Sequence, residues 1–111
     1  MSASAVLLLC TAPEGSADEI ARALVDERLA ACVTALGPAR SIYRWKGAVE
    51  RSEEIVLLVK TSISALEALR SRILDLHPYE VPEILEIPLE GGHQPYLDWV
   101  VESVRREGEA G

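Results

Sequence analysis

Phenylalanine is absent from this chain of 111 residues, methionine occurs once and cysteine twice. Two cysteines are too few for the disulfide framework of a small secreted domain, and Cys10 and Cys32 do not form a CxxC motif. No apolar run approaches the ~20 residues that a membrane-spanning helix needs. The longest run, Ala5–Cys10, follows no basic segment, so no signal peptide is visible. We therefore expect a cytoplasmic protein without a membrane partner, in which both thiols are small buried hydrophobes.

Basic residues are also scarce. The chain carries 11 Lys and Arg against 18 Asp and Glu, a formal net charge of −7, and no cluster of basic residues offsets it. Nucleic acids and anionic membrane surfaces are bound through such clusters, so neither is an expected partner. Cations are the more natural charged ligands.

Familiar enzyme motifs are missing as well. The sequence has no GxSxG, no P-loop, no HExxH and no glycine-rich phosphate cradle. A nucleophile pair of Cys10 and His77 would lack a recognisable orienting group and oxyanion donor. We therefore predict a protein that is not an enzyme.

Three of the expected strands can be read from hydrophobic patterning. Ala5–Cys10 (AVLLLC) and Ile55–Val59 (IVLLV) are continuous apolar runs, which are typical of strands buried on both faces. Between them, two extended pieces at 31–36 and 41–46 are separated by Gly37-Pro38, and the second alternates aromatic with basic residues. That alternation indicates a half-exposed strand.

Three segments have the pattern of helices. Ser16–Glu19 and Ser64–Glu67 each fit a capping box with the serine as N-cap, and apolar residues follow at helical spacing. The second helix must end at His77, because Pro78 disfavours helical geometry in the residue before it. Pro95 suits the first turn of a third helix.

A fourth strand, expected over 81–89, completes the order. Pro82 and Pro88 cannot donate ladder hydrogen bonds, which places this strand at a sheet edge. The order β-α-β-β-α-β plus a C-terminal helix is the ferredoxin-like split pattern of an α+β fold, in which two right-handed crossovers put the two continuous apolar strands in the centre of the antiparallel sheet. No linker divides the chain, so we expect a single domain over 1–111, ordered over about 5–104 and frayed over 105–111.

Both crossover helices of such a fold pack on one face of the sheet. The central strands supply apolar side chains to both faces, and exposing several hundred Å² of valine and leucine would cost many kcal/mol. We therefore expect another copy of the chain to cover the far face. The alternative is that the third helix folds over it.

The stretch LHPYEVPEI (76–84) carries candidate ligands. Because the first and fourth strands are antiparallel neighbours, Cys10 is expected close to His77, Tyr79 and Glu80. A thiolate, an imidazole and a carboxylate suit Cu(I), Cu(II) or Zn(II), in an open, weak or shared site, because two or three ligands do not close a structural zinc site. The alternative is that His77 caps its helix and Cys10 fills the core.

Several stretches match one known family in order over about residues 5–104. They are LCTAP (9–13), LAACV (29–33), SIYRWKG (41–47), IVLLVKT (55–61), LHPYEVPEI (76–84) and YLDWV (96–100). In these the chain resembles the CutA family of divalent-cation tolerance proteins. The resemblance implies a compact homotrimer of ferredoxin-like subunits, similar in assembly to PII signalling proteins.

The resemblance also implies a metal site. Copper in some family members is assigned to the cysteine of LCTAP and to two adjacent histidines before PY. Here the cysteine is Cys10 and the second histidine is His77, whereas Leu76 stands in place of the first. We therefore expect a trimeric, metal-binding protein of divalent-cation tolerance, with copper on Cys10 and His77, Glu80 as a helper, and a site one histidine short.

Two other functions are compatible with the same residues. One is a PII-like sensor that binds a small molecule in a cleft between subunits, lined by Tyr43, Trp45, Tyr79 and Trp99. The other is a rigid trimeric scaffold. For Tyr43, Trp45, Tyr96 and Trp99, the more common role of amphipathic aromatic residues is to fill a core or a subunit interface.

Overall fold

The computed structural model describes residues 4–105, which form one four-stranded sheet and three α-helices. In chain order the elements are β1 (Ala5–Ala12), α1 (Glu14–Asp26), β2 (Cys32–Trp45), β3 (Ala48–Ser62), the short 3₁₀ helix η2 (Ile63–Ala65), α2 (Leu66–Leu76), β4 (Ile84–Pro88) and α3 (Gln94–Ser103). No helix in this range is long and apolar enough to cross a membrane. Beyond Arg105, the tail predicted to fray lies outside the described residues.

The sheet is antiparallel with the order β2-β3-β1-β4. The two continuous apolar runs are its central strands, and Leu9 of β1 pairs with Leu58 of β3 on one side and Leu85 of β4 on the other. A central strand is covered along both edges and its side chains lie on both faces, which is why these two runs lack alternation. Element order and sheet order confirm the predicted α+β fold.

The edge strands differ in extent from the predictions. β2 is one strand rather than two pieces, because the chain crosses Gly37-Pro38 with a shift of register between Leu36 and Ala39 instead of leaving the sheet. Gly37 has φ of +150°, and a Cβ there would lie 2.9 Å from the Ile55 side chain, so the irregularity needs glycine. β4 begins only at Ile84, and residues 77–83 form an irregular segment before it.

Both predicted capping boxes are wrong. α1 begins three residues early, and its N-cap is Pro13, whose carbonyl oxygen accepts the N–H groups of Ser16 and Ala17 at 2.9 and 3.0 Å. Ser64 lies within η2, which leads directly into α2. The predicted end of α2 is confirmed, with His77 as the C-cap in extended geometry.

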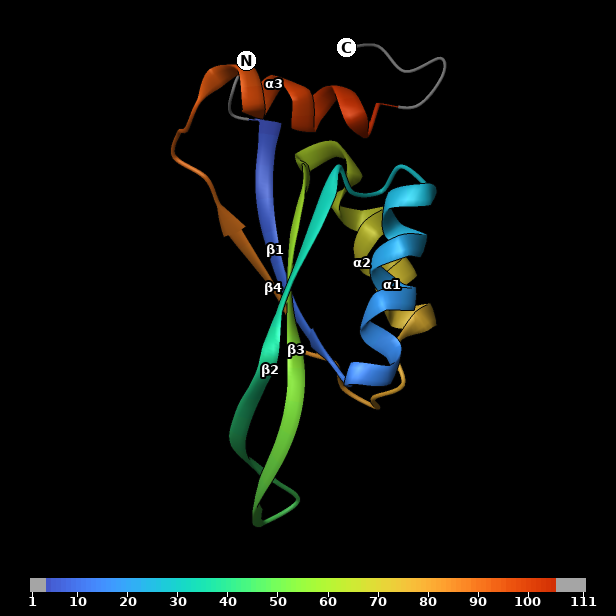
Figure 1. Ribbon diagram of the computed structural model, residues 1–111, viewed down its shortest axis with the longest axis vertical. Helices are drawn as coiled ribbons and strands as arrows, with labels where there is room; N and C mark the ends of the chain where they lie inside the picture. Colours follow the sequence, from blue (N-terminus) through green and yellow to red (C-terminus); the bar gives the residue numbers. More distant parts are fainter. Residues whose placement is uncertain (1–3, 106–111) are drawn as a thin grey trace.

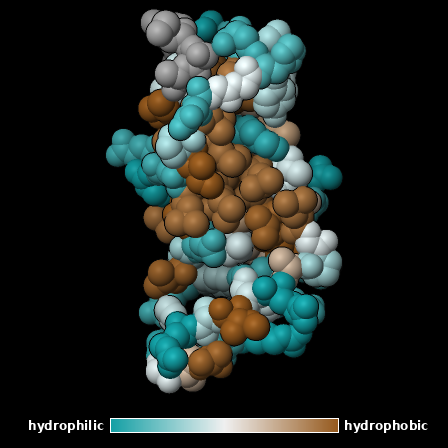
Figure 2. Space-filling view, turned by 90° about the vertical axis from the view of Figure 1, so that its left-hand side faces the viewer, coloured by the Kyte–Doolittle hydropathy of each residue, from teal (hydrophilic) through white to brown (hydrophobic). Residues whose placement is uncertain are grey.

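The two faces of the sheet are covered unequally. Helices α1 and α2 lie together on one face (Figure 1), where they bury a core that includes Leu8, Leu57 and Val59, each 0% exposed. On the other face the apolar side chains form a continuous surface (Figure 2). Register and alternation assign to this open face Leu7, Leu9, Leu36, Val56, Leu58, Leu85 and Ile87.

Helix α3 does not close the open face. It crosses one end of the sheet (Figure 1), where Leu97 and Val100 pack with Ala5. Leu36 and Leu85 remain 50% and 52% exposed. The same view shows the β2–β3 hairpin projecting from the opposite end of the sheet.

Candidate functional site

The first candidate site lies where the segment after α2 meets the end of β1. His77 is buried, and its Nε2 lies 2.7 Å from the carbonyl oxygen of Thr11. A carbonyl can only accept, so Nε2 is the donor in this hydrogen bond. The backbone N–H of Tyr79 donates to Nδ1 of the same ring at 3.2 Å. Both ring nitrogens of His77 are thereby engaged in hydrogen bonds.

Cys10 lies next to Thr11 on β1, with its side chain fully buried on the helix-covered face. Its thiol donates to the Thr11 carbonyl at 3.6 Å. Burial, with smaller contributions from the negative charges of Glu83 and Glu54, raises the pKa of this thiol to about 12. Because metals bind the thiolate, a metal ion at Cys10 must displace a firmly held proton.

Glu80 lies apart from these two residues. Its side chain is 74% exposed, and one carboxylate oxygen is 4.0 Å from Nζ of Lys46 in the turn of the β2–β3 hairpin. Within residues 4–105, no three His, Cys, Asp or Glu side chains are arranged to hold a metal ion. The fold thus brings His77 to the strand end that carries Cys10, as the topology predicted, and leaves Glu80 at the surface.

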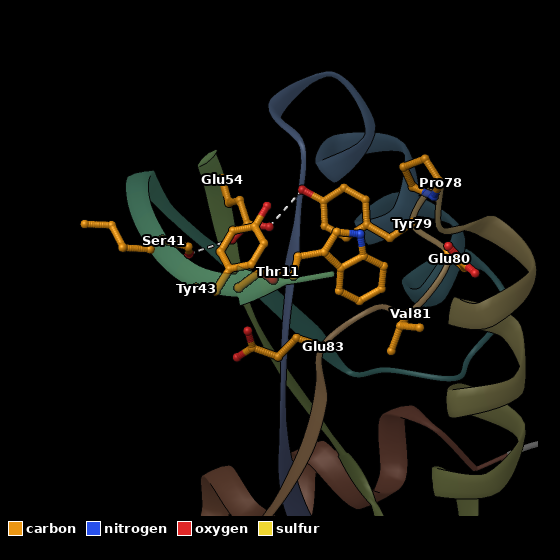
Figure 3. A pocket seen from close by; sticks show the side chains of 11 residues that line it. Thr11, Ser41, Tyr43, Glu54, Pro78, Tyr79, Glu80, Val81 and Glu83 are labelled. Atoms are coloured by element: carbon orange, nitrogen blue, oxygen red, sulfur yellow. Dashed lines mark hydrogen bonds between the residues drawn. The ribbon is translucent and has the colours of Figure 1, made fainter. Parts of the chain in front are cut away.

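The second candidate site is a pocket of about 700 Å³ beside this corner (Figure 3). Thr11 at the end of β1 forms part of its wall, as do Ser41 and Tyr43 of β2, Glu54 of β3 and the segment from Pro78 to Glu83. Three strands and the segment before β4 therefore line it together. Its volume lies within the range of small-molecule sites.

Glu54 is the most buried charged residue of the pocket, with 6% of its surface exposed. Ser41 Oγ donates to Oε1 at 2.6 Å, and the Tyr79 hydroxyl donates to Oε2 at 2.8 Å, as the dashed lines in Figure 3 indicate. Burial, followed by the hydrogen bond to Glu54 and its negative charge, raises the pKa of Tyr79 to about 12. Within residues 4–105 no basic side chain forms an ion pair with Glu54.

Aromatic rings and further carboxylates complete the pocket wall. The ring of Tyr79 packs against His77 with centroids 4.7 Å apart, and the Tyr43 hydroxyl is hydrogen-bonded to Ser52 at 2.7 Å. Trp45 lines the pocket too, with the Lys46 ammonium 5.7 Å from its ring centroid. Glu83 extends its carboxylate below Tyr43 in Figure 3.

The structure places three of the four predicted cleft residues together. Tyr43, Trp45 and Tyr79 line the pocket, whereas Trp99 lies on α3 beside Tyr96, with ring centroids 5.5 Å apart. Glu54 was not among the site residues predicted from the sequence. The alternation of side chains along β3 could have identified it. Glu54 lies two residues before Val56 and four before Leu58, so its side chain lies on the same face of the sheet as theirs.

Comparison with known proteins identifies a family. The family model described as CutA1 divalent ion tolerance protein matches residues 6–103. A "Divalent-cation tolerance protein CutA" from Pectobacterium atrosepticum is 44% identical over 102 residues, which cover 91% of this chain and 93% of that protein. One of the same name from Thermus thermophilus is 48% identical over 98 residues, covering 88% and 95%.

Solved structures agree with this similarity. The Thermus thermophilus protein superimposes with a TM-score of 0.86 at 48% identity, covering 89% of this chain and 97% of that one. A protein from Nostoc sp. PCC 7120, described as the PII-like protein CutA in apo form, gives a TM-score of 0.86 at 37% identity and covers 90% and 97%.

Proposed function

This chain belongs to the CutA1 divalent ion tolerance family, and on that premise we propose that it is a homotrimeric, copper-binding protein without catalytic activity that acts in divalent-cation tolerance. The observation that carries this proposal is the family match over residues 6–103. Two free cysteines agree with a place in the reducing cytoplasm.

The proposed metal ligands are Cys10 and His77, with Glu80 as a helper. A thiolate and an imidazole suit copper, and the thiolate favours Cu(I). The contacts described above set the conditions: Cys10 must lose its proton, and His77 must give up one of its two hydrogen bonds before a ring nitrogen can bind the metal. With Leu76 in place of a second histidine, we expect weak binding that strengthens as pH rises.

Anaerobic calorimetric titration with Cu(I), in competition with a Cu(I) chelator, tests this site. Wild type and Cys32→Ala should give the same affinity, whereas Cys10→Ala should bind about tenfold or more weakly, because it lacks the thiolate. Cys32→Ala is the matched control, since it also removes a thiol from a strand of the same sheet. Identical isotherms for wild type and Cys10→Ala would remove the proposed site.

The proposed trimer is supported by the open face of the sheet. Monomeric proteins rarely expose a continuous apolar surface of this kind, and this one spans all four strands. Contact with neighbouring copies would bury Leu36 and Leu85, which are half exposed in the single chain. We expect the assembly to be the functional unit.

The pocket favours a second candidate function, a PII-like role in which the trimer binds a small molecule. The observation in its favour is the cavity of about 700 Å³ with its aromatic and carboxylate walls. A thermal-shift screen of nucleotides, organic anions, amines and neutral metabolites tests this role. Stabilisation by at least one class is expected, and a screen in which no class raises the melting temperature would contradict it.

A further inference from the structure

We propose that the pocket binds a small organic cation, a protonated amine, whose ammonium group is held by the carboxylates of Glu54 and Glu83 against the aromatic rings of Tyr43, Trp45 and Tyr79. This inference names the ligand class for the small-molecule role proposed above and rests on it.

The charge of the lining selects the sign of the ligand. Three glutamates, Glu54, Glu80 and Glu83, line the pocket, and no described lysine, arginine or histidine does so. The neighbouring Lys46 offsets only Glu80, whose carboxylate lies 4.0 Å from its ammonium. Within residues 4–105 neither Glu54 nor Glu83 forms an ion pair. An anion would meet uncompensated like charge here, whereas a cation would be attracted.

Glu54 retains capacity for a ligand. A carboxylate offers about four acceptor positions, and the hydroxyls of Ser41 and Tyr79 occupy one on each oxygen. Burying a carboxylate without a counter-ion is costly, and these two neutral donors offset only part of that cost. A protonated amine supplies both the missing positive charge and N–H donors for the remaining positions.

The aromatic walls distinguish an organic cation from a metal ion. A hard divalent metal needs several oxygen ligands converging at short distance, and no three candidate ligand side chains converge within residues 4–105. The rings of Tyr43, Trp45 and Tyr79 instead offer π faces, which attract ammonium groups. The Lys46 ammonium, 5.7 Å from the Trp45 centroid, is an example at the edge of this pocket.

Three small molecules of similar shape separate the effect of ligand charge on affinity from the effect of ligand size. We would titrate the purified full chain, in its native assembly, with 2-phenylethylamine, 2-phenylethanol and phenylacetate, and measure affinity by calorimetry. The amine should bind about tenfold or more tightly than the alcohol, and phenylacetate should bind weakest. Equal affinity for amine and alcohol, or tighter binding of the acid, would overturn the inference.

Variants locate the site. Glu83→Gln and Glu54→Gln should each reduce the preference for amine over alcohol about tenfold, whereas Glu53→Gln, an exposed neighbour on the opposite face of β3, should leave it unchanged. Glu83 is exposed, so its variant decides the question if Glu54→Gln unfolds. An unchanged preference in Glu83→Gln overturns the proposed site.

The two proposals fail in different ways. If the thermal-shift screen finds that nucleotides or organic anions stabilise the protein while amines do not, the cation assignment falls and the small-molecule role stands. If no compound class stabilises the protein, both fall.

Discussion

The two faces of the sheet carry similar side chains in different surroundings. In β3, Leu57 on the helix-covered face is 0% exposed, and its neighbour Leu58 on the open face is only partly buried. The same contrast holds in β1 between Leu8 and Leu9. The chain thus contains apolar residues that its own helices do not cover, and the proposed homotrimer rests on this contrast.

The largest effect is expected from a charge on the open face. Leu58→Lys would bury an unpaired ammonium between copies, at a cost of roughly 3–5 kcal/mol per interface. Sedimentation velocity should then give a species of 12.1 kDa, with a circular dichroism spectrum of folded protein. The matched control is Leu74→Lys, on the outer surface of α2, where the leucine is 54% exposed. If Leu58→Lys and Leu74→Lys sediment alike, the open face is not an interface.

On the covered face, truncation should act on the stability of each subunit. Leu57→Ala leaves a cavity beneath α1 and should lower the free energy of unfolding by roughly 2–5 kcal/mol, as truncation of core leucines does. Urea denaturation at a fixed protein concentration measures this. A loss below about 1 kcal/mol, the size of an average substitution, would show that Leu57 is not tightly packed.

The two cysteines report separately on the two faces. Cys10 belongs to the covered core, whereas Cys32 lies at the open face opposite Lys60. In the Leu58→Lys variant at pH 8, iodoacetamide should modify Cys32 about tenfold faster than in wild type, because dissociation exposes it. Cys10 should stay unreactive in both, since its pKa of about 12 keeps the thiol protonated. Peptide mass spectrometry distinguishes the two cysteines. Rapid labelling of Cys10 in the folded protein would contradict the burial of its side chain.

The smallest expected effect concerns Tyr79, which links the segment after α2 to Glu54. Tyr79→Phe removes one hydrogen bond to a carboxylate and should cost about 1–2 kcal/mol at neutral pH. The folded pKa of about 12 lies above the ordinary value of 10.0, so the folded state holds the phenolic proton more tightly. The linked stability is therefore full below pH 10 and is lost as pH rises through about 12.

Alkaline titration of the phenolate absorbance checks this sign. Wild type should show a step near pH 12 that Tyr79→Phe lacks. If the curves of wild type and Tyr79→Phe instead differ only by a step near pH 10, the ordinary value of a tyrosine, then Glu54 and Tyr79 are not coupled in solution.

Hydrophobic periodicity made the fold predictable. The runs Ala5–Cys10 and Ile55–Val59 had to be central strands, and Pro78 had to end α2, because these signals lie within a few neighbouring residues. The start of α1 was mispredicted because Pro13 and Ser16 both suit a helix N-terminus, and only the backbone hydrogen bonds of the fold decide between them.

The candidate sites were only partly predictable. Topology sufficed to bring His77 toward Cys10, but the engagement of both ring nitrogens depends on Thr11, 66 residues away in the sequence. The pocket likewise depends on Glu54, whose burial follows from contacts with Ser41 and Tyr79. Such long-range contacts leave no periodic signal in the sequence.

Sedimentation equilibrium of the wild-type chain at micromolar concentration tests most directly whether neighbouring copies cover the open face. We predict one species with three times the chain mass of 12.1 kDa. A well-folded particle of 12.1 kDa would contradict the account, because the apolar surface in Figure 2 would then face water in the native protein.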